Sequence, residues 1–481
     1  MDSVWFATHT ASPATDTFED DAHTDVIVVG AGLTGLATAA LLARAGLHVT
    51  VLEARRIGAV TTGYTTGKLS VLQGLTLSGI HARHPDEVLR AYVEANREGQ
   101  AFLARLMDDR GVPYERRVAG TYATTEEGLA HLRVEQKASR IAGLDVQWTD
   151  ETELPFPVRG ALLLPDQVQI HPLRVLDMLH AELATHGGEV VEGVRVTGLD
   201  PAAPVTVTTT RGRMRADRVI LATGTPILDR SHFTTMVPIR SYATTYRLPG
   251  PIPQGMYLSA DTPIRSLRTV PVDGHELLMV GGNEHIVGRS ASPAAAVADL
   301  EAWTREHFPG AERTHAWSAQ DYRSADRLPF VGPLPDGGER VFTATGFNKW
   351  GLTNAVAAAL TLAERILGGS MPWADRLRHQ APSGGETTED WQVDLHALPD
   401  RLPAEGTGVV GLGPGDRPEA VSTVDGTTCR VSAVCTHLGG IVGWNDAERT
   451  WDCPWHGSRF AADGSQLEGP AVEDLERLDR E

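Results

Sequence analysis

Two cysteines and two histidines near the C-terminal end of the chain form the strongest chemical signal in the sequence. Cys435 and His437 share one Gly-rich loop, Cys453 and His456 share a second, and 15 residues separate His437 from Cys453. Two thiolates and two imidazoles divided in this way fit a [2Fe-2S] cluster in which one iron takes both Cys and the other both His. Zinc is the weaker alternative, because a structural zinc site usually keeps its two Cys together and places both His on a following helix.

A glycine-rich turn near the N-terminal end has the features of a dinucleotide-phosphate site. Gly30, Gly32 and Gly35 follow the apolar run 26–29 and open an Ala/Leu-rich segment. Such a turn lets the backbone approach a pyrophosphate closely and directs a helix N-terminus at its charge. Glu53 ends the next expected strand, 18 residues beyond Gly35, where its carboxylate can accept hydrogen bonds from both ribose hydroxyls.

NAD and FAD use the same type of turn, and the rest of the chain favours FAD. Residues 61–69 offer hydroxyls, small residues and one cation, which suit a pyrophosphate and a flavin edge. Residues 216–224 are typical of a strand that ends in a Gly turn, and residues 343–351 precede an Ala-rich helix. A second nucleotide site for NAD(P)H is not expected, because the Gly-rich segment 411–416 contains Pro414 and no helix follows it.

Over about residues 25–370, these motifs resemble the D-amino-acid-oxidase/glycine-oxidase superfamily of FAD-dependent amine oxidoreductases. The resemblance implies that the Gly turn before the last helix faces the flavin pyrimidine, where its amides and the helix dipole would stabilise a reduced, anionic ring. The residues expected to contact FAD are Gly30, Gly32, Leu33, Thr34, Gly35, Glu53, Ala54, Arg55, Thr61, Thr62, Thr65, Thr66, Gly67, Lys68, Val194, Ala222, Thr223, Gly224, Gly346, Phe347, Asn348, Lys349, Gly351, Leu352 and Thr353.

Lys68, Lys349 and Asp321 are the candidates for catalytic residues. The chain has only three Lys among its 43 basic residues, and two of them fall inside flavin-type segments. A compact ammonium can attract the charge of a reduced flavin or polarise dioxygen, although both could be ordinary surface cations. Asp321 falls where glycine-oxidase-like relatives place an Arg for a substrate carboxylate, so the resemblance favours a cationic amine. A structural role, in which Asp321 caps or pairs with Arg323 or Arg327, is the alternative.

Three arginines of the expected substrate domain, Arg240, Arg265 and Arg268, are alternative holders of a substrate carboxylate. Arg is suited to this role because its planar fork binds a carboxylate through two parallel hydrogen bonds. Ordinary surface charge is the preferred interpretation for each of them.

Residues 399–481 resemble a Rieske [2Fe-2S] domain throughout. Respiratory-complex Rieske proteins carry an extra Cys on each loop, joined as a disulfide, at positions that Gly440 and Trp455 hold here. They also carry a Tyr at the position of Phe460, while Ser458 is retained. Because one hydrogen bond to the cluster sulfur is then missing, the resemblance implies a reduction potential below the respiratory range.

The motifs predict an α/β FAD-binding (Rossmann-like) domain interleaved with an α+β substrate domain and followed by a small all-β Rieske domain. An N-terminal arm over residues 1–24 is expected to dock at one point through Val4, Trp5 and Phe6. The oxidoreductase domain is expected over residues 25–378, followed by a linker over 379–398 and the Rieske domain over 399–481. Its FAD-binding segments are 25–83, 160–235 and 315–370, and its substrate segments are 84–159 and 236–314.

The composition is that of a globular chain, with 41% hydrophobic and 22% charged residues. A net charge of −19 weighs against nucleic acid as a partner, because such binding depends on clustered Lys and Arg. No apolar run reaches the ~18 residues of a membrane span and no secretory leader is evident, so we expect no membrane span and a cytoplasmic protein. Three Cys cannot build a disulfide framework, and Cys429 is expected to be a small buried strand residue.

The two cofactors together predict an oxidoreductase, because a flavin exchanges electrons in pairs or singly and a Rieske cluster exchanges them singly. The preferred function is oxidation of a small amine or amino-acid-like substrate, with electrons passing between FAD and cluster. The alternative is an electron-transfer protein that serves a partner oxygenase or another redox protein. Residues 379–481 hold 19 acidic and 7 basic residues, net −12, which could steer a basic redox partner or simply be solvated surface.

Overall fold

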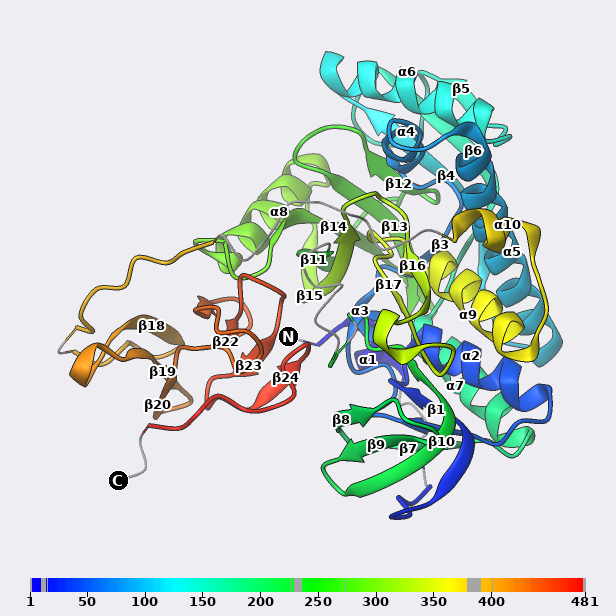
Figure 1. The fold of residues 1–481 in the computed structure, drawn as a ribbon. Coiled ribbons are helices and arrows are strands. Elements are labelled where there is room, and N and C mark those ends of the chain that lie inside the picture. Colours follow the sequence, from blue (N-terminus) through cyan, green and yellow to red (C-terminus); the bar gives the residue numbers. More distant parts are fainter. Residues whose placement is uncertain are drawn as a thin grey trace.

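The chain folds around two large sheets and two small ones (Figure 1). The computed structural model describes residues 2–9, 14, 16–225, 227–228, 236–272, 274–378, 391–399 and 401–478. No helix within these ranges is both long and apolar enough to cross a membrane.

The first sheet has a parallel centre. Its main path runs β16 (Phe330–Pro333), β17 (Val341–Thr345), β10 (Gly212–Leu221), β1 (His23–Val29), β2 (Val49–Leu52) and β7 (Glu189–Val191). β8 (Val196–Asp200) and β9 (Val205–Thr209) extend β10 as an antiparallel ribbon. β1 pairs in parallel with both β2 and β10, and its last four residues are all buried, as expected of a strand covered on both faces.

Three helices cover one face of this sheet: α2 (Leu33–Arg44), α7 (Pro172–Thr185) and α9 (Gly351–Leu367). The β8–β9 ribbon packs on the other face (Figure 1). α2 packs against both α7 and α9, and its Ala-rich sequence allows close approach. The turn between β1 and α2 lies where β1 separates β2 from β10, which is the switch point of a doubly wound sheet. Ligands of open α/β sheets bind at such a crevice, outside the carboxyl ends of the strands.

The second sheet is mostly antiparallel. Its path is β15 (Glu312–Ser324), β11 (Met236–Arg247), β14 (His275–Ile286), β13 (Arg265–Val272), β12 (Met256–Ser259), β4 (Glu115–Ala123), β6 (Gly160–Gln169) and β3 (Lys68–Leu69), with β5 (Gln147–Thr149) beside β6. The other helices of the two large domains are α3 (Thr61–Tyr64), α4 (Thr76–His81), α5 (Asp86–Arg110), α6 (Glu126–Ile141), α8 (Pro293–His307) and α10 (Pro372–Leu377).

The division between the domains differs from the sequence-based expectation at three strands. β3, β6 and β15 belong to the second sheet, whereas we expected them in FAD-binding segments. An apolar strand can pair in either sheet, and its partners are set by strands distant in the sequence. β15, for example, pairs along its whole length with β11.

The C-terminal domain consists of two small antiparallel sheets. One contains β18 (Thr407–Leu412), β19 (Pro418–Val424) and β20 (Thr427–Ser432), and the other contains β21 (Gly443–Asn445), β22 (Thr450–Asp452), β23 (Arg459–Ala461) and β24 (Gln466–Glu468). Trp451 and Phe460 face each other across β22 and β23 and are fully buried in its core. Most of the expected linker, residues 379–390, lies outside the described residues.

The N-terminal arm docks through α1 (Val4–Thr8), as its apolar residues predict. Trp5 is 1% exposed, and its Nε1 donates to the carbonyl of Thr65, while the Ser3 hydroxyl donates to the carbonyl of Gly63. The arm makes a second contact farther along, where Asp16 accepts from the backbone N–H of Val190. The arm therefore holds the loop that follows β2 in place.

Candidate functional site

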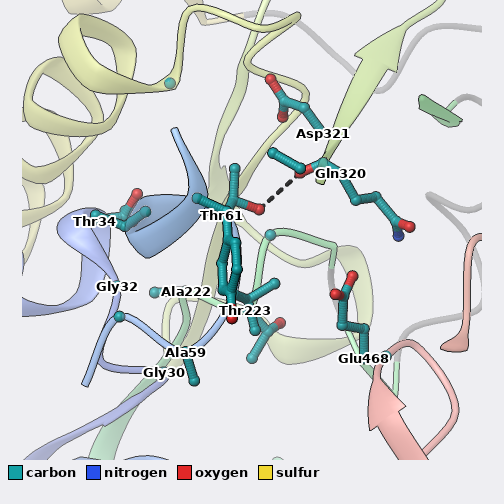
Figure 2. A pocket seen from close by; sticks show the side chains of 18 of the residues that line it. Gly30, Gly32, Thr34, Ala59, Thr61, Ala222, Thr223, Gln320, Asp321 and Glu468 are labelled. Carbon is teal, nitrogen blue, oxygen red and sulfur yellow. Dashed lines mark hydrogen bonds between the residues drawn. The ribbon is translucent and has the colours of Figure 1, made fainter. Parts of the chain in front are cut away.

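A long cavity lies at the carboxyl ends of β1, β2 and β10, between the first sheet and strands β11 and β15 of the second (Figure 2). Of the residues expected at FAD, those that line it are Gly30, Gly32, Leu33, Thr34, Glu53, Ala54, Arg55, Thr61, Thr62, Thr65, Thr66, Val194, Ala222, Thr223, Gly224, Phe347, Lys349, Gly351 and Leu352. The fold thus brings segments of four separate regions of the chain to one site.

The turn after β1 has no room for side chains. Gly30 has a φ of +105°, and a Cβ there would lie 2.7 Å from the carbonyl oxygen of Ala222. A Cβ on Gly35 would lie 1.9 Å from the carbonyl oxygen of Gly30. At Gly32, which precedes α2, a Cβ would project toward the Thr62 hydroxyl, 3.3 Å away, and fill the space before the helix N-terminus. This cradle fits a pyrophosphate, which needs close backbone approach and a helix dipole.

Glu53 joins this turn to the cavity. Its carboxylate accepts from the backbone N–H of Ala31 at 2.9 Å and from that of Arg55 at 2.8 Å, while Glu53 also lines the cavity. Burial raises the pKa of Glu53, and the two N–H donors oppose that shift. The remaining lone pairs of the carboxylate are those expected to accept from the ribose hydroxyls of FAD.

We predict that Glu53→Gln weakens FAD binding by about 1–3 kcal/mol, because charged hydrogen bonds to the ribose would be lost. The variant also presents an amide NH₂ to one of the two backbone N–H groups. Titration of flavin-free protein with FAD, followed by fluorescence quenching, measures the change. Affinity equal to that of the wild type would show that Glu53 does not contact the adenosine ribose.

Six expected cofactor residues lie outside the cavity lining: Gly35, Gly67, Lys68, Gly346, Asn348 and Thr353. Lys68 was also a catalytic candidate, but its Nζ donates to the carbonyl of Tyr257 at 2.8 Å and to the Ser266 hydroxyl at 2.6 Å. The reason is that β3 pairs with β6 and directs this side chain into the second sheet. Burial lowers the pKa of Lys68 to about 7, with Arg268 adding to the shift. Thr353 is likewise buried and accepts from Gln73 Nε2.

Asp321 and Lys349 meet at the other end of the cavity. Asp321 accepts from the backbone N–H groups of Tyr322, at 2.7 Å, and Lys349. The Lys349 ammonium pairs with Glu284 at 2.7 Å. Burial raises the pKa of Asp321 to about 6. A cation bound nearby would stabilise the ionised carboxylate.

The sequence did not reveal several other residues at this end. The walls include Tyr242, Trp317, Gln320 and Tyr322, all from β11 and β15. Trp317 lies on one face of β15 and Gln320 and Tyr322 on the other, so strand alternation alone could not have found them. The Tyr242 hydroxyl lies 2.9 Å from His285 Nε2, whose ring Nδ1 lies 2.9 Å from the carbonyl of Ile286. Nδ1 therefore carries the proton and Nε2 accepts from Tyr242.

The two expected cluster loops lie together at one end of the C-terminal domain. Cys435, Cys453 and His456 are buried, and the rings of His437 and His456 lie 5.1 Å apart between centroids at 87°. Burial and the neighbouring His437 lower the pKa of His456 to about 3, which favours the neutral imidazole that binds metal. Within the described residues, no three His, Cys, Asp or Glu side chains converge on a single ion position.

Gly440 and Trp455 stand at the two positions where respiratory Rieske proteins carry the disulfide-forming cysteines. A Cβ on Gly440 would lie 2.9 Å from the Trp455 ring and 3.0 Å from Cys453 Sγ, so the ring occupies the space that a disulfide would need. Ser458 is fully buried, and its Oγ accepts from the backbone N–H of Ala471 at 2.9 Å. The Ser458 hydroxyl proton is therefore available to the cluster side, where Cys435 lies.

Phe460→Tyr is expected to raise the cluster potential. Phe460 is fully buried in the core that contains Cys435 and Cys453, and a hydroxyl directed at sulfur would stabilise the reduced, more negative cluster. One hydrogen bond of about 1 kcal/mol corresponds to roughly 40 mV for a one-electron couple. A redox titration followed by electron paramagnetic resonance measures the shift, and a lower potential in the Tyr variant would contradict the hydrogen-bond argument.

Arg240 connects the two halves of the molecule and does not line the cavity. Its guanidinium lies 3.3 Å from both Glu448 and Glu468 of the C-terminal domain and donates to Ser318 and Gln320 of β15. The preferred interpretation as ordinary surface charge is therefore wrong, because Arg240 is 1% exposed, and the alternative role as a substrate-carboxylate holder is not supported, because the guanidinium pairs between domains.

Arg265 and Arg268 also lie outside the cavity lining. Arg265 pairs with Asp299 at 2.6 Å, and Arg268 donates to the carbonyls of Thr66 and Thr269. Neither directs its guanidinium to the site where a substrate would bind.

Comparison with known proteins agrees with this geometry. Residues 25–365 match the family model described as FAD dependent oxidoreductase, and residues 398–479 match that of the Rieske [2Fe-2S] domain. YhfW of Bacillus subtilis (strain 168), whose name describes a Rieske 2Fe-2S iron-sulfur protein, is 27% identical over 99% of this chain and 97% of its own.

Two further comparisons cover the oxidoreductase part. Gamma-glutamylputrescine oxidoreductase of Escherichia coli (strain K12) is 30% identical over 43% of this chain and 50% of its own. The crystal structure of glycine oxidase from Geobacillus kaustophilus has a TM-score of 0.61 at 20% identity, and covers 73% of this chain and 96% of that one. The predicted fold class and the predicted cofactors, FAD and a Rieske [2Fe-2S] cluster, are confirmed by the family matches.

Proposed function

Because the chain belongs to the FAD dependent oxidoreductase family and carries a C-terminal Rieske [2Fe-2S] domain, we propose that it oxidises a small cationic amine at a CH–NH bond and passes the electrons between its two cofactors. When bound, FAD supplies the acceptor for two electrons and the cluster supplies a carrier for one at a time. The observation that carries the proposal is the carboxylate of Asp321 in the cavity, at the position where an amino-acid oxidase would need a cation.

The cavity offers a cationic amine both charge and aromatic surface. Asp321 supplies a carboxylate from the cavity lining, while Glu284 lies outside that lining and pairs with Lys349. Tyr242 and Tyr322 also line the cavity, and an aromatic ring in a site that excludes water can attract a cation. The similarity to gamma-glutamylputrescine oxidoreductase, an enzyme named for an amine, supports the same substrate class.

Residues of this chain would also set the geometry at the flavin ring. The turn before α9 brings Phe347 and Gly351 to the cavity, and the N-terminus of α9 starts at Gly351. Its positive dipole end would stabilise negative charge nearby. The Tyr242–His285 pair provides a path by which a proton from the cavity side can move to the partly exposed imidazole.

A direct contact joins the cavity to a cluster-binding loop. Gln320 lines the cavity, and its Nε2 donates to the carbonyl of Gly457 at 2.9 Å. Gly457 follows His456, one of the four expected cluster ligands. A route of one hydrogen bond and a short stretch of backbone therefore supports electron passage within the chain.

Anaerobic mixing with a panel of amines and amino acids tests the proposal. A substrate amine should bleach the flavin absorbance and then produce the electron paramagnetic resonance signal of a reduced Rieske cluster in the same chain. Bleaching without that signal would reject electron passage between the cofactors. Reduction by a protein donor but by no amine would reject the amine-oxidising function in favour of an electron-transfer protein.

A further inference from the structure

A short segment of the C-terminal domain forms one wall of the cavity. Leu467, Glu468, Gly469, Ala471 and Val472 all line it, although they lie more than 100 residues beyond the other lining segments. Figure 2 shows Glu468 facing the cavity from its own strand, β24. We propose that this segment, residues 467–472, is part of the FAD site and links FAD retention to the state of the cluster domain. The proposal rests on the FAD site described above but not on the substrate.

The segment packs where the adenosine end of FAD is expected. Arg55, which follows Glu53 by two residues, donates from its guanidinium to the carbonyl of Leu467 at 3.4 Å. Val472 packs against the apolar core that includes Leu52 and Val194 of the first sheet. These contacts make the cluster domain the cover of the cavity beside Glu53.

The segment is tightly packed against the first-sheet domain at Gly469. A Cβ on Gly469 would lie 3.0 Å from the Ile227 side chain, which also lines the cavity. The backbone of the segment at Gly469 therefore packs directly on a side chain of the first-sheet domain. A molecule bound beside Glu53 would therefore contact the segment.

Two hydrogen bonds connect the segment to a cluster ligand. The backbone N–H of Cys453 donates to the carbonyl of Ser458 at 2.8 Å, and the Ser458 hydroxyl accepts from the backbone N–H of Ala471 at 2.9 Å. All three residues are at most 2% exposed. If loss of the cluster rearranged the loop that contains Cys453, these hydrogen bonds would therefore move residues 467–472 at the FAD site.

A buried ionic cluster holds the segment down from its other end. Glu468 lies between Arg240 of β11, at 3.3 Å, and Arg459 of β23, at 2.7 Å. Arg240 is 1% exposed and is the only one of the three that belongs to the oxidoreductase part. Removing one partner of a buried ionic cluster leaves the charges of the others uncompensated. Replacing Arg240 is therefore expected to weaken the contact between residues 467–472 and the oxidoreductase part.

Linkage gives these contacts a measurable consequence. If FAD binds the covered state more tightly than the open state, any change that opens the cover weakens FAD binding. By reciprocity, bound FAD stabilises the docked cluster domain by the same factor. The quantity to measure is the rate of FAD release, which reports the cover without any substrate turnover.

Val472→Asp tests the proposal in the full-length protein loaded with both cofactors. The charge would disrupt packing on the first-sheet core, and we expect FAD, detected by its fluorescence on release after dilution, to leave about tenfold faster. The matched control is Val424→Asp, the same change at the end of β19 in the other small sheet, which Figure 1 shows on the far side of the domain. This control should release FAD at the wild-type rate.

Arg240→Gln removes the ionic contact to Glu468 at the other end of the segment. This variant is the second test, to be used if Val472→Asp does not fold. Faster FAD release in either variant, with iron content unchanged, supports the proposal, as does faster release from wild type after chelation of the cluster. Release within twofold of wild type, while hydrogen exchange shows residues 466–475 exposed, would overturn it. Neither outcome depends on whether an amine bleaches the flavin. A failure of this proposal can therefore be told apart from a failure of the proposed amine oxidation.

Discussion

Cys453→Ala is expected to remove iron and acid-labile sulfide from the protein. Cys453 is 2% exposed and lies in the loop that also provides His456, and a Cβ on Gly440 would lie 3.0 Å from its Sγ. A methyl group cannot replace a thiolate ligand, and the remaining ligands would leave one iron with a single protein bond. We expect less than about a tenth of wild-type iron, because outer-shell changes alone cost 10–100-fold in metal affinity.

Cys429→Ala provides the matched control for this prediction. Cys429 is also buried, on β20, and belongs to neither cluster loop. Metal and sulfide analysis after anaerobic purification should find wild-type cluster content in this variant and flavin in both. If both variants kept the cluster, the assignment of Cys453 as a ligand would be refuted; if both lost it, the effect would be one of folding.

The cluster loops and the phosphate cradle were predictable because their signals are local. Cys435 and His437, or Gly30 and Gly32, are separated by one residue, so their types and spacing already define the chemistry. The fold class followed from the same motifs, since a strand, a Gly turn and a helix in order leave few topologies. Neither conclusion needed knowledge of contacts between distant segments.

Features that depend on distant contacts were not predictable. Arg240 was interpreted as ordinary surface charge, with substrate binding as the alternative, but it is buried beside Glu448 and Glu468, more than 200 residues later in the chain. Lys68 matched a flavin-type segment, but a two-residue strand pairs with β6 and turns its side chain away from the cavity. No periodicity in the sequence reports which face of a short strand a second sheet will bury.

The same limit applies to the substrate end of the cavity. Trp317, Ala319 and Asp321 line the cavity from alternate positions of β15, and Gln320 and Tyr322 line it as well. The Asp321 carboxylate also accepts from the backbone N–H of Lys349. Asp321 has a structural role, as acceptor from the backbone N–H groups of Tyr322 and Lys349, and its carboxylate also lines the cavity. A structural and a functional role coexist in this residue.

Asp321→Asn should separate these two roles by weakening the binding of a cationic amine. Asn keeps one oxygen that can accept from Tyr322, so the turn can persist while the charge is lost. A charged hydrogen bond of about 1.5–3 kcal/mol corresponds to a roughly 10- to 150-fold weaker apparent affinity for the amine. Anaerobic stopped-flow bleaching of the flavin at varied amine concentration gives that affinity separately from the limiting rate.

The pH dependence gives the prediction a second, independent readout. Burial raises the pKa of Asp321 to about 6, above the value of an exposed Asp, so the carboxylate is charged above that pH and neutral below it. Amine affinity in the wild type should therefore fall as the pH drops through about 6, and the Asn variant should lack this change. Glu284→Gln is the control, because Glu284 pairs with Lys349 and its loss leaves the charge of Asp321 in place. Equal affinities for the amine in Asp321→Asn and wild type, with an unchanged flavin spectrum, would show that the cation binds elsewhere and that Asp321 serves only the turn.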